Sequence, residues 1–217
     1  MEHEPVDLAA LRREYADGGL DVTDLAADPY AMFQRWLGEA LDAGVHEPNA
    51  MVLSTATPEG GPSSRMVLLK GVGSDGFVFY TNHASRKGAE LAANPRCALL
   101  FPWHPLERQV RIEGAASVIP DDEVEAYFRS RPRGAQLGAW ASDQSRPVAS
   151  RSALAASYAR VQERFGDDGP VPVPPEWGGY RVRPEVVEFW QGRPSRMHDR
   201  LVYRRRDDAW TTERLAP

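Results

Sequence analysis

The stretch AMVLSTATPEGGPSSRMVLLKGVGSDGFVFYTN, residues 50–82, decides the fold of this chain. Short runs rich in apolar and β-branched residues alternate there with the turn-forming strings PEGGP and SDG. Such runs, separated by Pro, Gly, Ser and Asp, are typical of β-strands that follow one another through short turns. The stretch therefore predicts consecutive antiparallel strands.

More strands are predicted toward the C-terminus. In the run 107–119, Gln109 and Arg111 alternate with Val110 and Ile112, which gives the predicted strand one polar and one apolar face. The full set of strands predicted on this side is 96–104, 107–119, 181–192, 196–206 and 208–215.

Helices are predicted between and before these strands. Asp28 and Pro29 begin a helix whose apolar residues recur at helical spacing until Gly44. A shorter helix is predicted over 85–94, with Ser85 as its N-terminal cap. The remaining helical stretch, 121–165, is broken at Pro132 and near Pro147 and leads into a Pro- and Gly-rich loop, 169–180.

About seven strands and four helices, with neighbouring strands close in sequence, favour a mainly-β fold class, an antiparallel β-barrel decorated by helices. The 217 residues suit one domain, which we place at 28–217. Residues 1–27 mix charge, Gly and Ala with little periodicity, and we expect them to form a mobile N-terminal arm.

Composition excludes several classes of function. The net charge of −5 argues against a protein that wraps nucleic acid. The single cysteine, Cys97, cannot form an internal disulfide and points to a reducing compartment. The N-terminus is acidic and no apolar run approaches the roughly 20 residues that span a bilayer. We therefore expect a cytoplasmic protein with neither nucleic acid nor membrane as partner. The five histidines are scattered without ligand spacing, so no metal site is expected.

Cationic side chains stand beside apolar strands. Arg65 and Lys70 bracket the run MVLL, and Arg86 and Lys87 stand at the predicted start of the 85–94 helix. A helix N-terminus with unpaired N–H groups and two cations suits a phosphate, although a solvated basic helix start is the alternative. Arg65 and Lys70 are five residues apart and would face opposite sides of a regular strand. Either they serve different groups, or the strand twists or bulges between them.

A second cationic group lies in FWQGRPSRMHDR, which begins at Phe189. In a strand, Arg196, His198 and Arg200 would share one face at period two, where like charges repel unless an anion lies among them. The pattern indicates an anionic ligand, and the alternative is the exposed polar face of an edge strand.

Other candidates are less specific. The string YFRSRP adds Tyr127 and Arg131, which a favourable contact between cations and a helix C-terminus also explains. Gln144 and Ser145 by themselves are ordinary loop residues. The chain contains no dinucleotide fingerprint, P-loop, nucleophile elbow or metalloprotease helix.

A series of strings in one order along the chain carries a family resemblance. They are LRREY (11–15), RMVLLK (65–70), FYTN (79–82), SRKG (85–88), LLFPWHPLERQVRIEG (99–114), YFRSRP (127–132), GAWASDQS (138–145), EWGGYRV (176–182), VEFWQGRPSRMHDR (187–200) and RLAP (214–217). Together they resemble the pyridoxine (pyridoxamine) 5′-phosphate oxidase family almost from end to end.

The resemblance implies a split β-barrel homodimer that holds FMN at the subunit interface. It implies oxidation of pyridoxamine or pyridoxine 5′-phosphate to pyridoxal 5′-phosphate, with O2 as electron acceptor and hydrogen peroxide as product. By motif match, the residues similar to the flavin-binding set are Arg65, Met66, Val67, Tyr80, Thr81, Arg86, Lys87, Gln109, Gln144, Ser145, Trp190 and Arg200. Those similar to the substrate set are Lys70, Tyr127, Arg131, Arg196 and His198, with Arg12 to Tyr15 as a segment that closes over the site.

Within this resemblance we expect Arg196 and His198 to be the catalytic residues, Arg196 covering the pyridine ring and His198 orienting the reacting substituent or moving a proton. One departure concerns Ala135, where similar family members often carry a serine that contacts the substrate phosphate. Two other functions stay open: a split-barrel flavin reductase with a different electron donor, and a module that binds pyridoxal phosphate or flavin without turnover.

Overall fold

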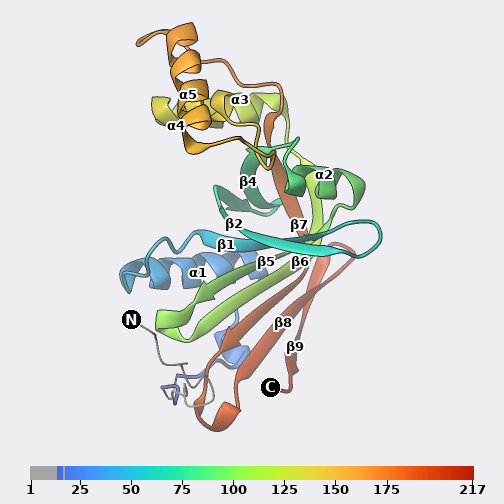
Figure 1. The fold of residues 1–217 in the computed structure, drawn as a ribbon. Helices are drawn as coiled ribbons and strands as arrows, with labels where there is room; N and C mark the ends of the chain where they lie inside the picture. The colour runs from blue at the N-terminus through green and yellow to red at the C-terminus, as the bar shows by residue number, and fades with distance from the viewer. Residues whose placement is uncertain (1–13, 17) are drawn as a thin grey trace, which may run out of the picture. The chain divides into compact units, whose positions relative to one another are not determined.

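The computed structural model describes residues 14–16 and 18–217 (Figure 1). The chain divides into two compact units. Unit 1 contains the described residues up to 48, together with 102–111 and 187–217. Unit 2 contains 49–101 and 112–186. The predicted boundary between a mobile arm, 1–27, and one domain stays a prediction.

The described strands form one hydrogen-bonded sheet in the order β2-β1-β5-β6-β7-β4-β3, and β8 pairs with both β7 and β9. Their bounds are β1 Ala50–Ala56, β2 Pro62–Leu68, β3 Gly71–Gly73, β4 Gly76–Asn82, β5 Arg96–Trp103, β6 Arg108–Val118, β7 Trp177–Gln191, β8 Asp199–Arg206 and β9 Ala209–Leu215. The helices are α1 Pro29–Asp42, α2 Arg86–Ala93, α3 Asp121–Ser130, α4 Arg133–Ala141 and α5 Arg151–Phe165, with short 3-10 turns at Val22–Asp24, His104–Leu106 and Pro194–Arg196.

In unit 2 the alternating pattern of the opening stretch becomes an antiparallel β1–β2 pair, with Leu53 opposite Arg65. Met51 and Leu53 are completely buried, and Val52 and Ser54, which alternate with them, are half-buried on the other face of β1. Strand β2 is less buried along its length and forms the end of the sheet order next to β1. The register thus places Arg65 within reach of β1 side chains.

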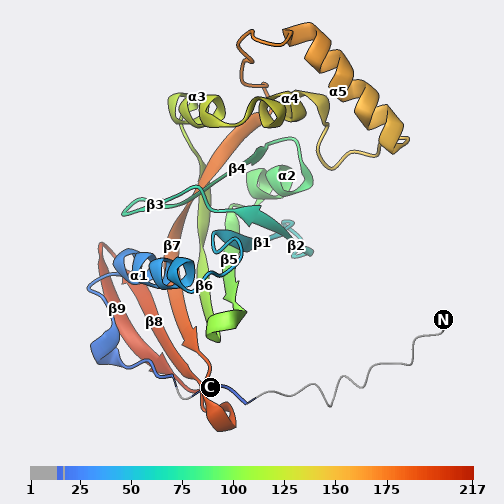
Figure 2. The ribbon, with the colours of Figure 1, turned by 90° about the vertical axis from the view of Figure 1, so that its left-hand side faces the viewer.

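Helix α2 begins at Arg86, and Ser85 caps it by accepting a hydrogen bond from the Gly88 N–H. A Cβ atom at Gly88 would lie 2.1 Å from the backbone oxygen of His83, so only glycine permits this close packing. Three further helices, α3, α4 and α5, lie together within unit 2 (Figure 2). They pack around a core that includes Phe128, Leu137 and Trp177.

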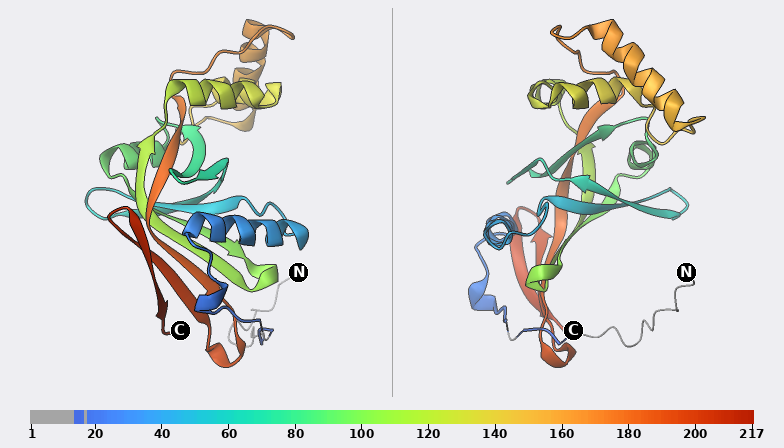
Figure 3. Two further views of the ribbon diagram at one scale, coloured as in Figure 1. Left: turned by 180° about the vertical axis from the view of Figure 1, so that it is seen from behind. Right: turned by 60° about the vertical axis from the view of Figure 1, so that its left-hand side comes forward.

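In unit 1, α1 lies beside the strands (Figure 3). Asp28 caps this helix by accepting from two backbone N–H groups, and Pro29 occupies its first turn, as predicted. The Trp36 ring packs edge-on against Phe189 at a centroid distance of 5.2 Å. The hairpin β8–β9 completes this unit through a register that pairs Arg200 with Leu215.

The described residues form nine strands and five α-helices, more than the predicted seven and four. One cause is that the run 63–73 splits into β2 and β3. The strand predicted over 196–206 is wrong at its start, because Ser195 and Arg196 have φ angles of +56° and +61° and β8 begins only at Asp199. Positive φ angles interrupt extended backbone, so Arg196, His198 and Arg200 do not alternate along one strand face.

Candidate functional site

A cavity of about 660 Å³ lies in unit 2 and collects many of the predicted residues. Its volume is in the range of small-molecule sites. The lining residues are Arg65, Met66, Val67, Leu68, Lys70, Tyr80, Thr81, Asn82, Lys87, Tyr127, Arg131, Pro132, Ala135, Gly138, Ala139, Ser142, Gln144 and Trp177.

All the charged side chains in this lining are cations. Arg65, Lys70, Lys87 and Arg131 line the cavity, and none of the described lining residues is an aspartate or glutamate. Cations gathered along the wall of a concave site attract an anionic ligand, and charge-assisted bonds to phosphate are among the strongest. The cavity can therefore hold phosphate esters.

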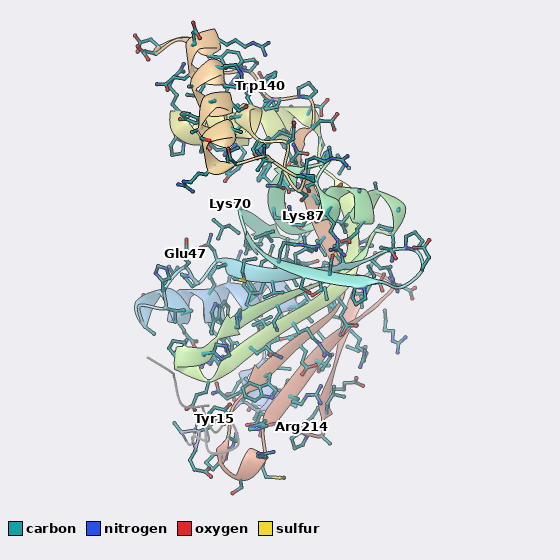
Figure 4. The ribbon with its side chains drawn as sticks, viewed as in Figure 1. Tyr15, Glu47, Lys70, Lys87, Trp140 and Arg214 are labelled. Atoms are coloured by element: carbon teal, nitrogen blue, oxygen red, sulfur yellow. The ribbon has the colours of Figure 1, made fainter. Side chains whose placement is uncertain are left out.

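Lys87 is the most deeply placed of these cations and is 8% exposed. Its ammonium donates to Gln144 Oε1 at 2.7 Å and to Thr81 Oγ1 at 3.0 Å, both neutral acceptors. Burial, together with repulsion from Arg65, lowers the pKa of Lys87 to about 8. An anion bound beside this buried ammonium would strongly stabilise its charged form. Figure 4 shows Lys87 on α2 and Lys70 in the connection from β2 to β3.

A buried carboxylate, Glu90, holds Arg65 beside the cavity. Glu90 Oε2 lies 3.2 Å from the Arg65 guanidinium, and Oε1 accepts from Arg86 at 2.8 Å. Thr55 and Ser63 donate their hydroxyls to Oε2 as well. These donors outweigh burial and lower the pKa of Glu90 to about 2. The carboxylate is therefore ionised at neutral pH.

Three aromatic rings stack along one wall of the cavity. The rings of Tyr80 and Tyr127 are 3.9 Å apart, and Tyr80 and Trp177 are 5.4 Å apart and nearly parallel. The guanidinium carbon of Arg131 lies 4.9 Å from the centre of the Trp177 ring. Burial lowers the pKa of Arg131, and its buried Nη1 has no hydrogen-bond partner. An unsatisfied buried cationic donor at the wall of a cavity marks a place for an acceptor.

The structure resolves the question of how Arg65 and Lys70 can act together. Strand β2 ends at Leu68, and the Lys70 N–H donates to Val78 in β4. Because the chain leaves the β2 direction between the two cations, strand parity no longer separates them. Both line the same cavity.

A second group of predicted residues lies in unit 1 and is called here the Trp190 cluster: Tyr15, Trp190 and His198. The Tyr15 ring lies 5.9 Å from Trp190 and 5.5 Å from His198, edge-on in both cases. The Arg193 N–H donates to His198 Nδ1 at 3.1 Å. Since Nδ1 accepts this bond, a neutral His198 carries its proton on Nε2 and presents an N–H donor there.

A second buried carboxylate, Glu188, organises unit 1. It accepts two hydrogen bonds from Arg200, at 2.8 and 3.1 Å, and one from Arg111 at 2.8 Å. Its hydrogen bonds raise the pKa of Arg200. The sequence indicated an external anion for Arg200, whereas the structure supplies a carboxylate from the chain itself.

The structure thus groups some predicted residues and leaves others apart. Arg86 and Ser145 do not line the cavity, since Arg86 pairs with Glu90 and Ser145 is exposed with a φ angle of +71°. The predicted residues found in unit 1 are Tyr15, Gln109, Trp190, Arg196, His198 and Arg200. Arg12 lies outside the described residues. Ala135 lines the cavity, so the departure noted at that position lies inside it.

Sequence reasoning missed Glu90 and Glu188. The spacing of Arg86 and Glu90, four residues apart on a predicted helix, was an available signal for their ion pair. No comparable local signal exists for Glu188, because Arg111 is 77 residues away in sequence and Arg200 lies on the next strand, whose register the sequence does not reveal. Within the described part of the chain, no group of three or more His, Cys, Asp or Glu side chains could hold a metal ion.

Family models match two long stretches of the chain. The model of the family described as "Pyridoxamine 5'-phosphate oxidase" matches residues 37–165. A second model, "Pyridoxine 5'-phosphate oxidase C-terminal dimerisation region", matches residues 177–217. The chain belongs to the pyridoxine (pyridoxamine) 5′-phosphate oxidase family.

Relatives in this family cover nearly the whole chain. A pyridoxine/pyridoxamine 5′-phosphate oxidase of a Nocardioides species is 67% identical over 98% of this chain and 99% of its own length. The protein of the same name from Rubrobacter xylanophilus is 58% identical over 97% of each chain.

A solved structure supports the same fold. PhzG from Burkholderia lata 383, solved in complex with tetrahydrophenazine-1-carboxylic acid, is 32% identical, with a TM-score of 0.86 over 93% of this chain and 99% of PhzG. The family and this neighbour confirm the predicted mainly-β, split-barrel fold class. Among the residues that the structure describes, no helix has the length and apolar character needed to cross a membrane.

Proposed function

We propose that this family member oxidises pyridoxamine and pyridoxine 5′-phosphate to pyridoxal 5′-phosphate, with FMN as its cofactor. Dioxygen is the electron acceptor and hydrogen peroxide the second product; the amine substrate also consumes water and releases ammonium. The observation that carries the proposal is the cavity with four cations and no carboxylate in its described lining. Two phosphate esters, one on the cofactor and one on the substrate, account for this excess of positive charge.

The residues present fit FMN. Lys87 donates hydrogen bonds to the neutral side chains of Thr81, Ser85 and Gln144. It stands in the first turn of α2, where backbone N–H groups also attract anions. Arg65 is held beside it at the cavity wall. We assign the FMN phosphate to Lys87, Arg65, Thr81 and Gln144. FMN, when bound, supplies the redox chemistry by accepting a hydride from the substrate and passing electrons to dioxygen.

The substrate phosphate is assigned to Lys70, Tyr127 and Arg131. The buried Nη1 of Arg131 can donate to a phosphate oxygen, and Tyr127 presents a hydroxyl from the stacked aromatic wall. Lys70 is exposed and adds charge at the same cavity. Ala135 offers no hydroxyl, so the other three residues bind this phosphate without a serine.

By their match to the family's substrate motif, we assign the placement of the reacting end of the substrate to residues of the Trp190 cluster and its surroundings. We assign Arg196, which is exposed on its 3-10 turn, to cover the pyridine ring. His198 donates from Nε2 and orients the substituent that is oxidised, because its Nδ1 already accepts from Arg193. Tyr15 contacts both Trp190 and His198, which supports its assignment to the substrate set. Hydride transfer then depends on placement of the substrate carbon rather than on a strong base.

We further propose that the protein acts as a homodimer with FMN at the subunit interface. The match of residues 177–217 to a dimerisation region supports this assembly. The flavin-binding set includes Gln109, Trp190 and Arg200 of unit 1 as well as cavity residues of unit 2. A cytoplasmic location fits the lone buried thiol, Cys97, because burial raises its pKa to about 12 and leaves it unreactive.

Anaerobic reduction tests the proposal. Protein loaded with FMN is mixed without oxygen with pyridoxamine 5′-phosphate, pyridoxine 5′-phosphate or unphosphorylated pyridoxamine as control. We expect the two phosphorylated substrates to bleach the flavin absorption and to yield pyridoxal 5′-phosphate, and admission of oxygen to restore the colour with formation of hydrogen peroxide. FMN that binds but is never reduced by either phosphorylated substrate contradicts the oxidase and favours a binding module. Reduction by a nicotinamide donor alone indicates a reductase.

A further inference from the structure

Glu90 lies next to the cavity but does not line it, and it is 6% exposed. Four side chains from three elements meet its carboxylate: Thr55 of β1, Ser63 and Arg65 of β2, and Arg86 of α2. A charge this deeply buried is tolerated only when its partners satisfy it, and here both oxygens are occupied. Glu90 therefore ties the first turn of α2 to the β1–β2 pair.

The three cations near Glu90 differ in whether they pair with its carboxylate. Arg65 and Arg86 both pair with it, while Lys87 stands close by and has no carboxylate among its hydrogen-bond partners. Arg65 already repels the ammonium of Lys87 and helps to lower its pKa. Without the negative charge of Glu90, the guanidinium of Arg65 would act on Lys87 uncompensated and would lose one of its anchors.

We propose that Glu90 is a positioning residue for the cofactor phosphate, holding the Arg65 guanidinium at the cavity wall and compensating its charge beside Lys87. This inference rests on the proposed function, since it takes the phosphate bound by Lys87 and Arg65 to be that of FMN. Glu90 itself does not touch the cofactor. It acts through Arg65, whose guanidinium also donates to Leu53 and Thr55 in β1.

A neutral residue of the same shape separates positioning from simple packing. In Glu90→Gln, one oxygen can still accept from Thr55, Ser63 and Arg65, but the amide nitrogen faces the donor Nε of Arg86 and the negative charge is lost. The groups that face Lys87 are Arg65 from β2, Thr81 from β4, Ser85 at the start of α2, and Gln144. Of these, only Arg65 is charged.

The experiment measures the FMN dissociation constant of the apoprotein between pH 6 and 10 by quenching of flavin fluorescence. In the wild type, affinity should fall as pH rises through about 8, where Lys87 loses its proton. In E90Q we expect this fall at lower pH and an affinity weaker by roughly three- to tenfold at neutral pH, the range of coupling through one neighbouring side chain. A purely structural role would not move the midpoint of the pH profile.

The control is Glu125→Gln on α3, because Glu125 and Arg129 form an exposed ion pair with the same four-residue spacing. This variant should bind FMN as the wild type does at every pH. An E90Q protein with the affinity and midpoint of the wild type overturns the inference. A wild-type apoprotein that binds no FMN at any pH contradicts the proposed function instead.

Should E90Q fail to fold, Glu90→Asp decides. It keeps the charge but withdraws the carboxylate from Arg65 by one methylene, so FMN should bind more weakly with a midpoint close to that of the wild type. Affinity equal to the wild type in E90D shows that the position of the carboxylate does not matter and also overturns the inference.

Discussion

Two buried carboxylates, Glu90 in unit 2 and Glu188 in unit 1, each bind a pair of arginines. The two clusters differ in the charge that remains beside them. The Glu90 cluster, made of Glu90, Arg65 and Arg86, stands beside Lys87, whose pKa is lowered to about 8. In the Glu188 cluster, made of Glu188, Arg111 and Arg200, the hydrogen bonds of the carboxylate raise the pKa of Arg200.

The difference shows how one chain can use the same pair of residue types for two purposes. At Glu188 the carboxylate stabilises the charge of Arg200 and orients its guanidinium through a bidentate pair of hydrogen bonds. At Glu90 the carboxylate fixes Arg65 but leaves the buried Lys87 ammonium without an anion. On the proposed function, the arrangement at Glu90 leaves a cation available to bind a phosphate, whereas the arrangement at Glu188 holds Arg200 in place.

The largest effect is expected from Arg196, which belongs to neither cluster. Replacement of Arg196 by alanine should lower the rate of substrate oxidation by about a hundredfold or more, because misplacement of the reacting groups has costs of this size. FMN should stay bound, as judged by absorption after gel filtration. Loss of FMN from R196A would move this residue from the substrate set to the flavin set.

Lys87→Met should weaken FMN binding by about 10- to 100-fold, the worth of one charge-assisted hydrogen bond. The same variant should unfold at an equal or higher temperature than the wild-type apoprotein at pH 7. The folded-state pKa of about 8 lies below the ordinary value of 10.5, so the charge of Lys87 opposes folding below pH 8 and this cost disappears as pH rises toward 10.5. Unchanged flavin occupancy after dialysis would contradict the assignment.

Glu188→Gln sharpens the comparison between the clusters. Because Arg200 would lose its charged partner, FMN affinity should fall by roughly three- to tenfold. Unlike E90Q, this variant should keep the wild-type pH midpoint of FMN binding, since among the described residues the hydrogen-bond partners of Glu188 are arginines and not a lysine. Titration of both variants side by side gives the measurement, and a midpoint that moves in E188Q would remove the distinction between the two clusters.

The smallest effect is expected at the aromatic wall. Trp177→Leu removes the ring against which Arg131 lies, a contact worth about 1 kcal/mol, so KM for the phosphorylated substrate should rise about fivefold with kcat nearly unchanged. Trp177→Phe should restore most of the affinity. Equal KM values for all three proteins would show that Arg131 holds its position without Trp177.

Local chemistry made much of this predictable. The start of α2 could be read from Ser85, and the place of Lys87 in its first turn followed directly. Strand alternation correctly predicted the apolar face of β6, where Val110 and Ile112 are completely buried. The strand predicted over 196–206 was wrong at its start, because alternation alone does not reveal positive φ angles at Ser195 and Arg196.

The two carboxylate clusters show what sequence could not supply. Glu188 and Arg200 meet because β7 pairs with β8, and Arg111 reaches the same carboxylate from β6. The Arg111 contact depends on pairing between strands 77 residues apart, and the Arg200 contact depends on the register of β8 beside β7. The buried state of Glu90 likewise depends on the β1–β2 pair that covers it.

Proton uptake on FMN binding tests the central claim most directly. FMN is titrated calorimetrically into wild-type and K87M apoprotein at pH 8.5 in two buffers with different ionisation enthalpies. If the cavity holds an unbalanced Lys87 with a pKa near 8, the phosphate restores its proton, and the wild type should take up a measurable fraction of a proton that K87M does not. Binding enthalpies that are the same in both buffers for the wild type would contradict the claim that Lys87 takes up a proton when it binds the FMN phosphate.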